Sequence, residues 1–351
     1  MHITQFDYEL DTSRIAHTPA NPRDTSKLMV VHRDTGKTQD HHFFELPKLL
    51  TENDVLVFNN TKVFPARLFG TKDTGGKIEI LLTRPLTDTQ WYALYKGHLT
   101  VGQQIQFAGV TAQVKELVDG QVLLAFNGSA RQVKALIDEA GHTPIPPYIH
   151  TDLSESELRK RYQTVYAQEN GSIAAPTAGL HFTDKLIQNL KAKGVTIEEI
   201  TLHVGIGTFA PVKTDELKDH TMHTEWYEVS EEVAARLNAA KAAGKRIVAV
   251  GTTTTRVLES LSAHGKLTGP LSGSTDIFIY PPYAFSFVDA LITNFHLPKS
   301  TLLALVSAFV SSPNTKHEFT SFSDSVVGKA YEEAQKNGYR FFSFGDAMFI
   351  Q

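Results

Sequence analysis

Two segments, APTAGLHFT at residues 175–183 and LHVGIGTFAPV at residues 202–212, carry the pattern from which we interpret the whole chain. His181 lies in the first segment and His203 in the second, and small residues crowd beside both: Ala178, Gly179, Gly205 and Gly207. Small residues let a backbone approach another group closely or adopt a positive φ, whereas a packed core needs volume. Each histidine also has hydroxyl neighbours in its segment: Thr177 and Thr183 for the first, Thr208 for the second. We therefore predict two loops that line a ligand site and are joined by a helix and a strand.

The composition is that of an ordinary soluble globular protein, with 41% hydrophobic and 21% charged residues in a chain of 351. Cysteine is absent, which excludes disulfides, thiolate zinc sites and thiol nucleophiles and fits a reducing cytoplasm. The chain shows no signal-peptide pattern and no apolar run long enough to span a membrane. Its net charge, 34 − 38 = −4, argues against a general coat for nucleic acid but permits one local basic face. We expect a cytoplasmic monomer without a membrane partner.

Between residues 68 and 147 the sequence pattern differs from that on either side. Short alternating runs are separated there by glycine turns, and Asp119-Gly120 between two such runs indicates a hairpin. Several short strands at regular spacing predict a small β-barrel. In residues 1–67 and 148–351, helices and strands alternate, which is typical of an α/β layer or barrel. We therefore expect an α/β protein whose larger, discontinuous domain contains an inserted small β-barrel.

Several predicted strands end in polar residues. DVLVFNNTKV at residues 54–63 ends in Asn59 and Asn60, which suit either ligand binding or a plain asparagine turn. RIVAVGTTTTRVLES at residues 246–260 places Gly251 and four threonines at a strand-to-helix turn. Such a turn offers free N–H groups to a carboxylate or another anion, although for the motif taken alone a hydroxyl-rich helix cap is the slightly better explanation. It matches neither a Walker loop nor a dinucleotide fingerprint.

A metal site has to be considered at HTMHTE, residues 220–225, where His220 and His223 stand near Glu225. The segment is more typical of a strand, in which His223 and Glu225 share a face, and we interpret these two as a buried pair. A spaced third ligand is missing. A metal-dependent hydrolase built on these three residues remains an alternative class of function.

Further polar residues stand in apolar surroundings near the C-terminus. ITNFHLPKS at residues 292–300 ends a predicted strand in a group that favours a site: Asn294, His296, Lys299 and Ser300. Asp276 in the predicted strand STDIFIY and Asp346 in FFSFGDAMF are carboxylates among apolar residues, and each should have a partner. A turn role would also explain Asp346. YRFFSF at residues 339–344 is predicted as the last strand.

Seven ordered motifs together resemble the S-adenosylmethionine:tRNA ribosyltransferase-isomerase family of queuosine biosynthesis: APTAGLHFT, LHVGIGTFAPV, HTMHTE, GTTTTRVLES, TDIFIYPPY, DALITNFHLPKSTLLALVSAF and YRFFSFGDAMFI. FDYEL, RDTSKLMV and DVLVFNNTKVFPARL resemble it too, so the likeness spans nearly the whole chain and is weakest in the inserted segment. Three positions depart from the family pattern: Lys27 replaces a usual Arg, Pro282 a usual Gly and Ala304 a usual Met. Only Lys27 bears on recognition, because lysine cannot replace a bidentate arginine contact.

The resemblance implies an enzyme that moves the ribosyl part of S-adenosylmethionine onto 7-aminomethyl-7-deazaguanine at the wobble position of tRNA. Epoxyqueuosine would form, and adenine and methionine would leave. The family fold is a larger barrel-like α/β domain with a small inserted β-barrel. The implied partners are tRNA and S-adenosylmethionine, with no metal and no further cofactor.

The implied chemistry needs a base, an acid for adenine departure and donors for the methionine carboxylate. We expect His181 and His203 to carry the proton transfers, because neutral imidazole can do either task, and Asp346 to complete the catalytic group. The residues expected to bind S-adenosylmethionine are Asn59, Asn60, Thr177, Gly179, Gly205, Gly207, Glu225, Thr252, Thr253, Thr254 and Asp276. Glu225, Asp276 or Asp346 would receive the methionine ammonium or the adenine edge. The residues expected to contact tRNA are Arg256, Asn294, His296 and Lys299. For Arg256, which lies on a predicted helix, a purely structural role is the alternative.

A third class of function is a tRNA-binding module without chemistry, in which the β-barrel binds the RNA. The many small and polar residues at strand ends argue against it, because a pure binder has little use for a deep pocket.

Overall fold

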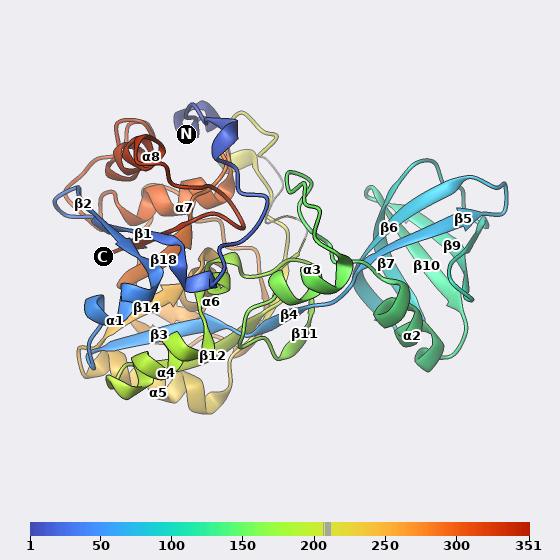
Figure 1. Ribbon diagram of the computed structural model, residues 1–351, viewed down its shortest axis with the longest axis horizontal. Helices are drawn as coiled ribbons and strands as arrows, with labels where there is room; N and C mark the ends of the chain where they lie inside the picture. The colour runs from blue at the N-terminus through green and yellow to red at the C-terminus, as the bar shows by residue number, and fades with distance from the viewer. Residues whose placement is uncertain (206, 208–211) are drawn as a thin grey trace.

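The computed structural model describes residues 1–205, 207 and 212–351. An α/β domain and a β-barrel lie next to each other, joined by a narrow segment that contains β4 (Thr61–Val63), β11 (Glu169–Ser172) and α3 (Glu155–Arg161) (Figure 1). The predicted α/β class with an inserted β-barrel is confirmed. No helix in the described ranges has the length and apolarity needed to cross a bilayer.

The α/β domain is built on one mixed sheet of nine strands, so the barrel-like arrangement expected for this domain takes the form of a sheet with two edge strands. In spatial order the strands are β17 (Ser272–Thr275), β13 (Glu225–Glu228), β12 (Thr196–Leu202), β3 (Asp54–Asn59), β14 (Arg246–Val250), β18 (Ala290–Asn294), β19 (Ala347–Ile350), β1 (Lys27–His32) and β2 (Lys37–His42). The four central strands β12, β3, β14 and β18 run parallel to one another. Their carboxyl ends therefore meet at one edge, which is where ligands bind in open α/β sheets.

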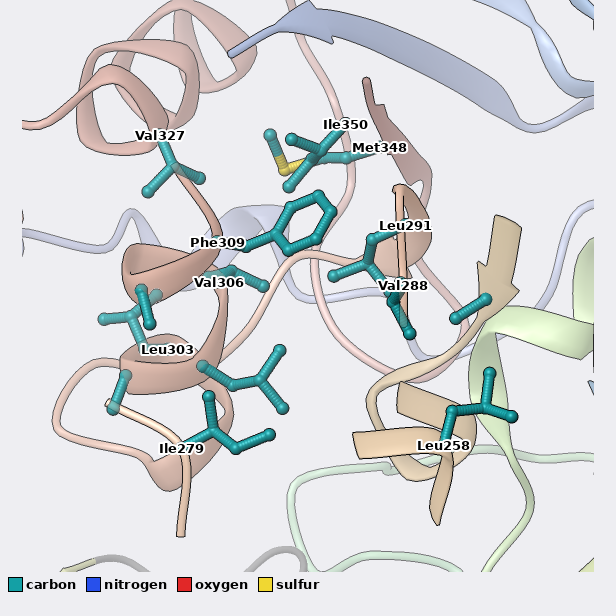
Figure 2. Packing of buried hydrophobic residues seen from close by; sticks show 14 of the residues in the cluster. Leu258, Ile279, Val288, Leu291, Leu303, Val306, Phe309, Val327, Met348 and Ile350 are labelled. Atoms are coloured by element: carbon teal, nitrogen blue, oxygen red, sulfur yellow. The ribbon is translucent and has the colours of Figure 1, made fainter. Parts of the chain in front are cut away.

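Alternate residues of each strand enter separate cores, because side chains alternate between the two faces of a sheet. In β3, Val55 and Val57 belong to one cluster, and Leu56 and Phe58 to the other. The first face is covered by α5 (Glu231–Ala242), α6 (Thr252–Leu261), α7 (Thr301–Phe309) and α8 (Val326–Lys336). The second face is covered by α1 (Leu46–Leu49), α4 (Asp184–Ala192) and the 3₁₀ turns η4 (Phe43–Glu45) and η5 (Thr177–His181). Figure 2 shows the first core, where side chains of α7 pack toward β18 and β19: Leu303, Val306, Phe309, Leu291, Met348 and Ile350.

Caps predicted from the sequence mark where the helices begin. Ser154 caps α3 in a capping box with Glu157, and Thr183 caps α4, which ends shortly before Gly194 at φ 89°. The remaining short elements are η1 (Ile3–Phe6), η2 (Thr12–Arg14), η3 (Arg23–Thr25), η7 (Leu217–Asp219), β15 (Ser262–Ala263) and β16 (Lys266–Leu267).

The inserted unit is a closed barrel of six strands: β5 (Arg67–Lys72), β6 (Lys77–Thr87), β7 (Gln90–Lys96), β8 (Gln104–Gln106), β9 (Thr111–Val118) and β10 (Gln121–Asn127). Asp119 and Gly120, both with positive φ, turn β9 into β10 as predicted. Helix α2 (Ala130–Ala140) packs Val133, Leu136 and Ile137 into the barrel core. The barrel and α2 thus occupy residues 67–140, and we retain the division at 68–147 as a proposal for the domain boundary.

The predicted strand at residues 339–344 is wrong. Phe342 has φ 70°, and a Cβ at Gly345 would lie 2.5 Å from the Arg340 carbonyl oxygen, so the chain turns tightly there. The last strand, β19, begins only at Ala347. Likewise β17 ends at Thr275, so Asp276 follows the strand instead of lying within it. Aromatic residues favour strands locally, but the turn at Gly345 overrides that preference here.

Candidate functional site

The site forms where the parallel strands end. Asn59 ends β3, His203 follows β12, Gly251 follows β14 and Asn294 ends β18. Asn59 is fully buried and ties three of these elements together. Its Nδ2 donates to the Leu202 carbonyl at 3.0 Å and to Thr253 Oγ1 at 3.4 Å, and its Oδ1 accepts from the N–H groups of Leu202 and Thr61. All four hydrogen-bonding positions of the amide are used within the protein. Its neighbour Asn60 accepts from Thr201 Oγ1 at 2.7 Å.

His203 is held from three sides and keeps one ring nitrogen available. Its main-chain N–H donates to the Trp226 carbonyl at 2.9 Å, and its ring stacks on the Trp226 indole with the ring centroids 5.0 Å apart. Its Nδ1 lies 2.8 Å from Thr61 Oγ1. No described residue forms a hydrogen bond with Nε2. Burial lowers the pKa of His203, and Glu169 opposes that shift. The ring is therefore neutral at pH 7. In the tautomer in which Nδ1–H donates to Thr61, the lone pair lies on Nε2.

Gly171 leaves the space that the His203 ring occupies. It forms the irregular position in the pairing of β11 with β4, and its φ is 153°. A Cβ there would lie 2.5 Å from His203 Nε2, closer than any side chain can tolerate. Gly171 also lines a cleft of about 1210 Å³, whose other lining residues come from both domains. The available nitrogen of His203 is thus next to a residue that lines this cleft.

The cleft is lined by more cations than anions: six lysine and arginine side chains lie there beside the carboxylates of Asp88 and Asp138. Arg23 and Arg159 donate to main-chain carbonyls and help build its wall. Four further cations in the lining are exposed, and the described residues give them no ion pair: Lys62, Arg131, Lys134 and Lys160. Trp91 and Phe64 add aromatic surface, with ring centroids 5.7 Å apart. These residues come from η3, from β4 and the residue after it, and from β7, α2 and α3, so most of them are distant from one another in the sequence. Arg159 and Lys160 of α3 are the two that lie in a local basic run, RKR at residues 159–161.

His181 is more enclosed than His203. Its Nδ1 lies 2.8 Å from Ser26 Oγ, its Nε2 lies 3.2 Å from Asn294 Nδ2, and its ring stacks on Phe43. Asn294 Nδ2 also donates to the Phe342 carbonyl, which fixes the amide orientation and makes Nε2 of His181 an acceptor. Burial, together with the charges of Arg340 and Arg23, lowers the pKa of His181 to about 3. Both ring nitrogens are occupied by the protein.

His296 has a comparable environment. Its ring Nε2 lies 2.8 Å from Thr293 Oγ1. Its main-chain N–H donates to Tyr331 Oη, and its main-chain carbonyl accepts from Tyr8 Oη. Burial lowers the pKa of His296 to about 3. In the unfolded chain the same group has a pKa near 6.5.

We expect this difference to make the protein acid-labile. Between pH 6.5 and 3 the unfolded state binds a proton at His296 that the folded state does not, so stability falls as the pH falls. At pH 5 the loss from this residue is about 2 kcal/mol. His296→Gln should reduce by that amount the difference in the free energy of unfolding between pH 7.5 and pH 5, measured with urea. His98→Gln, at an exposed position of the barrel, should keep the wild-type difference. An unchanged pH dependence in His296→Gln would contradict the assignment.

The start of α6 is an open helix end. Gly251, with φ 93°, is the N-cap and supplies no capping side chain. The hydroxyls of Thr254 and Thr255 donate back to the carbonyls of Val250 and Gly251, so they do not cap the first turn either. Thr252 and Thr253 line a small cavity of about 10 Å³. The four threonines predicted as a ligand turn are all buried.

Glu225 and Arg256 form a buried ion pair. Glu225 Oε2 meets Arg256 Nη1, and Glu225 Oε1 accepts from the Gly205 N–H at 2.8 Å. The predicted buried pair of His223 and Glu225 is wrong: His223 is exposed, and its ring lies where a Cβ at Gly207 would point. Arg256, expected to contact tRNA, is 4% exposed. Within residues 1–205, 207 and 212–351, no group of three His, Asp or Glu side chains is arranged to hold a metal ion.

The other predicted residues lie around this edge. Asp346 is buried and accepts from the N–H groups of Lys27 and Arg340, which gives it the expected partners. Asp276 is exposed, and Lys299 pairs with Asp7 at 2.8 Å. Thr177 is half-buried, and Gly179 is needed because a Cβ there would lie 1.9 Å from Tyr166 Oη. Thr208 falls outside the described residues.

The three departures from the family pattern lie away from the His203 ring. Lys27 Nζ donates to the Asn337 carbonyl at 2.6 Å, so it anchors the end of α8. Pro282 is exposed, and Ala304 is buried in the core face of α7.

Comparisons with known proteins give one consistent result. A family model described as queuosine biosynthesis protein matches residues 3–350. A protein from Thermodesulfovibrio yellowstonii named S-adenosylmethionine:tRNA ribosyltransferase-isomerase is 46% identical, over 100% of both chains. The protein of that name from Desulfitobacterium hafniense is 48% identical, also over 100% of both chains. The crystal structure of S-adenosylmethionine tRNA ribosyltransferase from Thermotoga maritima is 38% identical, with 99% of this chain and 100% of that one covered and a TM-score of 0.55.

Proposed function

Because this chain belongs to the queuosine biosynthesis protein family, we propose that the edge of the sheet described above is where it transfers and isomerises the ribosyl moiety of S-adenosylmethionine onto tRNA. The observation that carries this conclusion is the 46–48% identity over the full chain to proteins named for that reaction. The acceptor in this proposal is the aminomethyl group of 7-aminomethyl-7-deazaguanine at the wobble position. The product is epoxyqueuosine, and adenine and methionine leave.

His203 is the proposed proton-transfer residue. The reaction needs a base for the carbon next to the sulfonium or for the acceptor ammonium. Three features support this role: Nε2 has no described partner, the ring is neutral, and it lies beside a residue that lines the cleft. Trp226 and Thr61 fix the plane of the ring.

His181 and Asp346 are proposed to position the elements around the site through hydrogen bonds within the protein. Both ring nitrogens of His181 have protein partners, and both oxygens of Asp346 accept from the main chain. They hold the ends of β1, β18 and β19 against η5, and so set the shape of the pocket wall. Asn59 does the same for β3, β12 and α6. Asp276 remains proposed for the methionine ammonium, since it directly precedes residues 277–279, which line the cavity at α6.

The interdomain cleft is the proposed place for the tRNA. Its exposed cations lie on both walls, with Lys62 and Lys160 on the α/β side and Arg131 and Lys134 on α2 beside the barrel. Lysine and arginine bind phosphate without regard to sequence, and aromatic rings such as Trp91 stack on bases. A wobble base inserted into the cleft at Gly171 would lie near the His203 ring, which is adjacent to that glycine.

Reversing two of these charges should weaken tRNA binding specifically. In Arg131→Glu/Lys134→Glu we expect the KM for tRNA to rise by roughly tenfold or more and the dependence of binding on log[salt] to lose about two units of slope. The KM for S-adenosylmethionine should stay unchanged. Lys77→Glu/Lys115→Glu alters the net charge equally at exposed barrel positions outside the cleft. If both double variants weakened tRNA binding alike, a general charge effect would replace the cleft as the explanation.

The overall proposal is tested by adenine release. Chelator-treated protein is incubated with S-adenosylmethionine and tRNA carrying the aminomethyl-deazaguanine, and free adenine is measured by chromatography. Release that requires the modified tRNA supports ribosyl transfer over both the hydrolase at His220, His223 and Glu225 and the non-catalytic tRNA-binding module. Activity that disappears with the chelator and returns with metal would favour the hydrolase. A cytoplasmic location and a monomeric state complete the proposal.

A further inference from the structure

Arg256 has one guanidinium nitrogen to which the described part of the chain gives no hydrogen-bond partner. The side chain rises from the second turn of α6 and is 4% exposed. Its Nε donates to the Ile277 carbonyl at 3.2 Å, and its Nη1 pairs with Glu225. Its Nη2 is buried, and no described residue accepts a hydrogen bond from it. A charged donor that is buried and unpaired costs free energy. We therefore expect a ligand to supply the acceptor at this position.

The same position faces the open end of α6. The first N–H groups of a helix carry partial positive charge and need acceptors. Five other long helices satisfy them with a serine or threonine N-cap, as Ser300 does in α7, whereas Gly251 offers nothing. The helix has ten residues, so its macrodipole is fully developed.

One small cavity joins these two features. Thr252, Thr253 and Arg256 line it together with Thr301 in the first turn of α7, and the rest of the lining is apolar: Met222, Ile277, Phe278, Ile279, Leu302 and Leu305. None of the lining residues is acidic. At about 10 Å³ the cavity holds about one water-sized group, such as one oxygen atom of a carboxylate.

Glu225 sets the direction of the free nitrogen. It binds Nη1 of Arg256, and the Gly205 N–H holds its other oxygen. Gly205 stands two residues after His203, and Thr253 is joined through Asn59 to Leu202, the residue before His203. Residues around the cavity and the proton-transfer residue His203 are therefore connected through the same segment, residues 202–205.

We propose that Arg256 Nη2 and the first N–H groups of α6 bind the carboxylate of the methionine part of S-adenosylmethionine. This inference rests on the proposed function and gives Arg256 a different ligand from the tRNA phosphate that the sequence led us to expect. A carboxylate accepts well from both guanidinium and helix N–H groups. With the carboxylate end of the substrate fixed at this position, the sulfonium and the ribose carbons beside it extend toward His203.

The test pairs a change in the substrate with a change in the protein. S-adenosylmethionine is compared with its decarboxylated form, which keeps the sulfonium and the adenosine. We expect wild-type enzyme to prefer the carboxylate-bearing substrate by roughly 10- to 100-fold in kcat/KM. In Arg256→Gln that preference should fall by roughly tenfold, because only the carboxylate-bearing substrate loses the guanidinium contact. The N–H groups of α6 remain in this variant.

Arg256→Gln leaves Glu225 buried without its cation, which threatens folding. Glu225→Gln/Arg256→Gln removes both charges and keeps the side-chain lengths, and it should show the same loss of preference. Arg256→Lys keeps the positive charge but lacks the second guanidinium nitrogen, so it should recover little of the preference for the carboxylate-bearing substrate. Calorimetry of both substrates without tRNA separates binding from turnover and should show the same ratios.

The outcomes separate this inference from the proposed function. A wild-type enzyme that treats both substrates alike, or a double variant that keeps the full wild-type preference for the carboxylate, would overturn it. A change confined to the KM for tRNA would return Arg256 to tRNA binding. If no adenine were released but calorimetry still showed the carboxylate preference and its loss in the variants, the proposed function would fail and the carboxylate site would stand. If neither substrate bound to wild-type protein, both would fail.

Discussion

His203→Gln is expected to release adenine about 10²- to 10⁴-fold more slowly than the wild-type enzyme, the range that removal of a general base or acid produces. The substitution removes Nε2, the one ring nitrogen without a described partner, and keeps a side chain able to contact Thr61. The KM values for both substrates should change little, since the ring serves the chemical step. Single-turnover release of adenine at saturating tRNA measures the effect directly.

A pH profile distinguishes proton transfer from a structural role. Burial holds the pKa of His203 below its usual value, so kcat/KM should be flat at neutral pH and fall only on the acid side, below about 6.5. In His203→Gln that acid limb should disappear. His98→Gln, on the barrel surface, serves as the matched control and should behave as wild type. Full turnover in His203→Gln would remove this residue from the mechanism.

Gly171→Ala should lower turnover by roughly 10²-fold, because a displacement of about 1 Å in a catalytic group has effects of that size. The added Cβ would meet His203 Nε2 at 2.5 Å, and the ring would have to leave its stack on Trp226. The backbone conformation at φ 153° also disfavours alanine. The diagnostic result is a low kcat in a protein that is still folded and still binds tRNA.

Gly75→Ala is the control for backbone strain alone. Gly75 has φ 84°, and a Cβ there would meet nothing within 4 Å. Both variants should lose some stability, but only Gly171→Ala should lose turnover. Equal activity in the two variants would show that the His203 ring does not need the space at residue 171.

Much of the fold follows from local pattern. The serine and threonine caps, the strand periods and the Asp119-Gly120 turn depend on residues within a few positions of one another, and such signals define elements. The same signals placed Asn59, His203 and Thr253 at strand ends, and parallel topology then brings them together. The turn at Gly345 was missed because tight packing against the Arg340 carbonyl, and not the local composition, determines it.

The functional ranking of the two histidines could not be predicted in this way. His181 and His203 have similar neighbours in sequence, yet the first is enclosed by Ser26 and Asn294, which lie 155 and 113 positions away. Arg256 likewise appeared suited to a phosphate until the chain brought Glu225 against it. Contacts over such separations depend on how the strands are ordered, and spacing within a motif carries no record of that order.

The two strands that lead into and out of the barrel also hold the His203 ring. Thr61 of β4 binds its Nδ1, and Gly171 of β11 lies against its Nε2. With tRNA between the barrel and the α/β domain, a change in the width of the cleft would therefore alter the geometry around His203, and the state of that site would alter the cleft. Thermodynamic reciprocity then sets a strict condition: the factor by which bound tRNA tightens S-adenosylmethionine must equal the factor by which S-adenosylmethionine tightens tRNA. The two substrates would communicate through β4 and β11, and cooperativity in binding would measure how stiff that connection is.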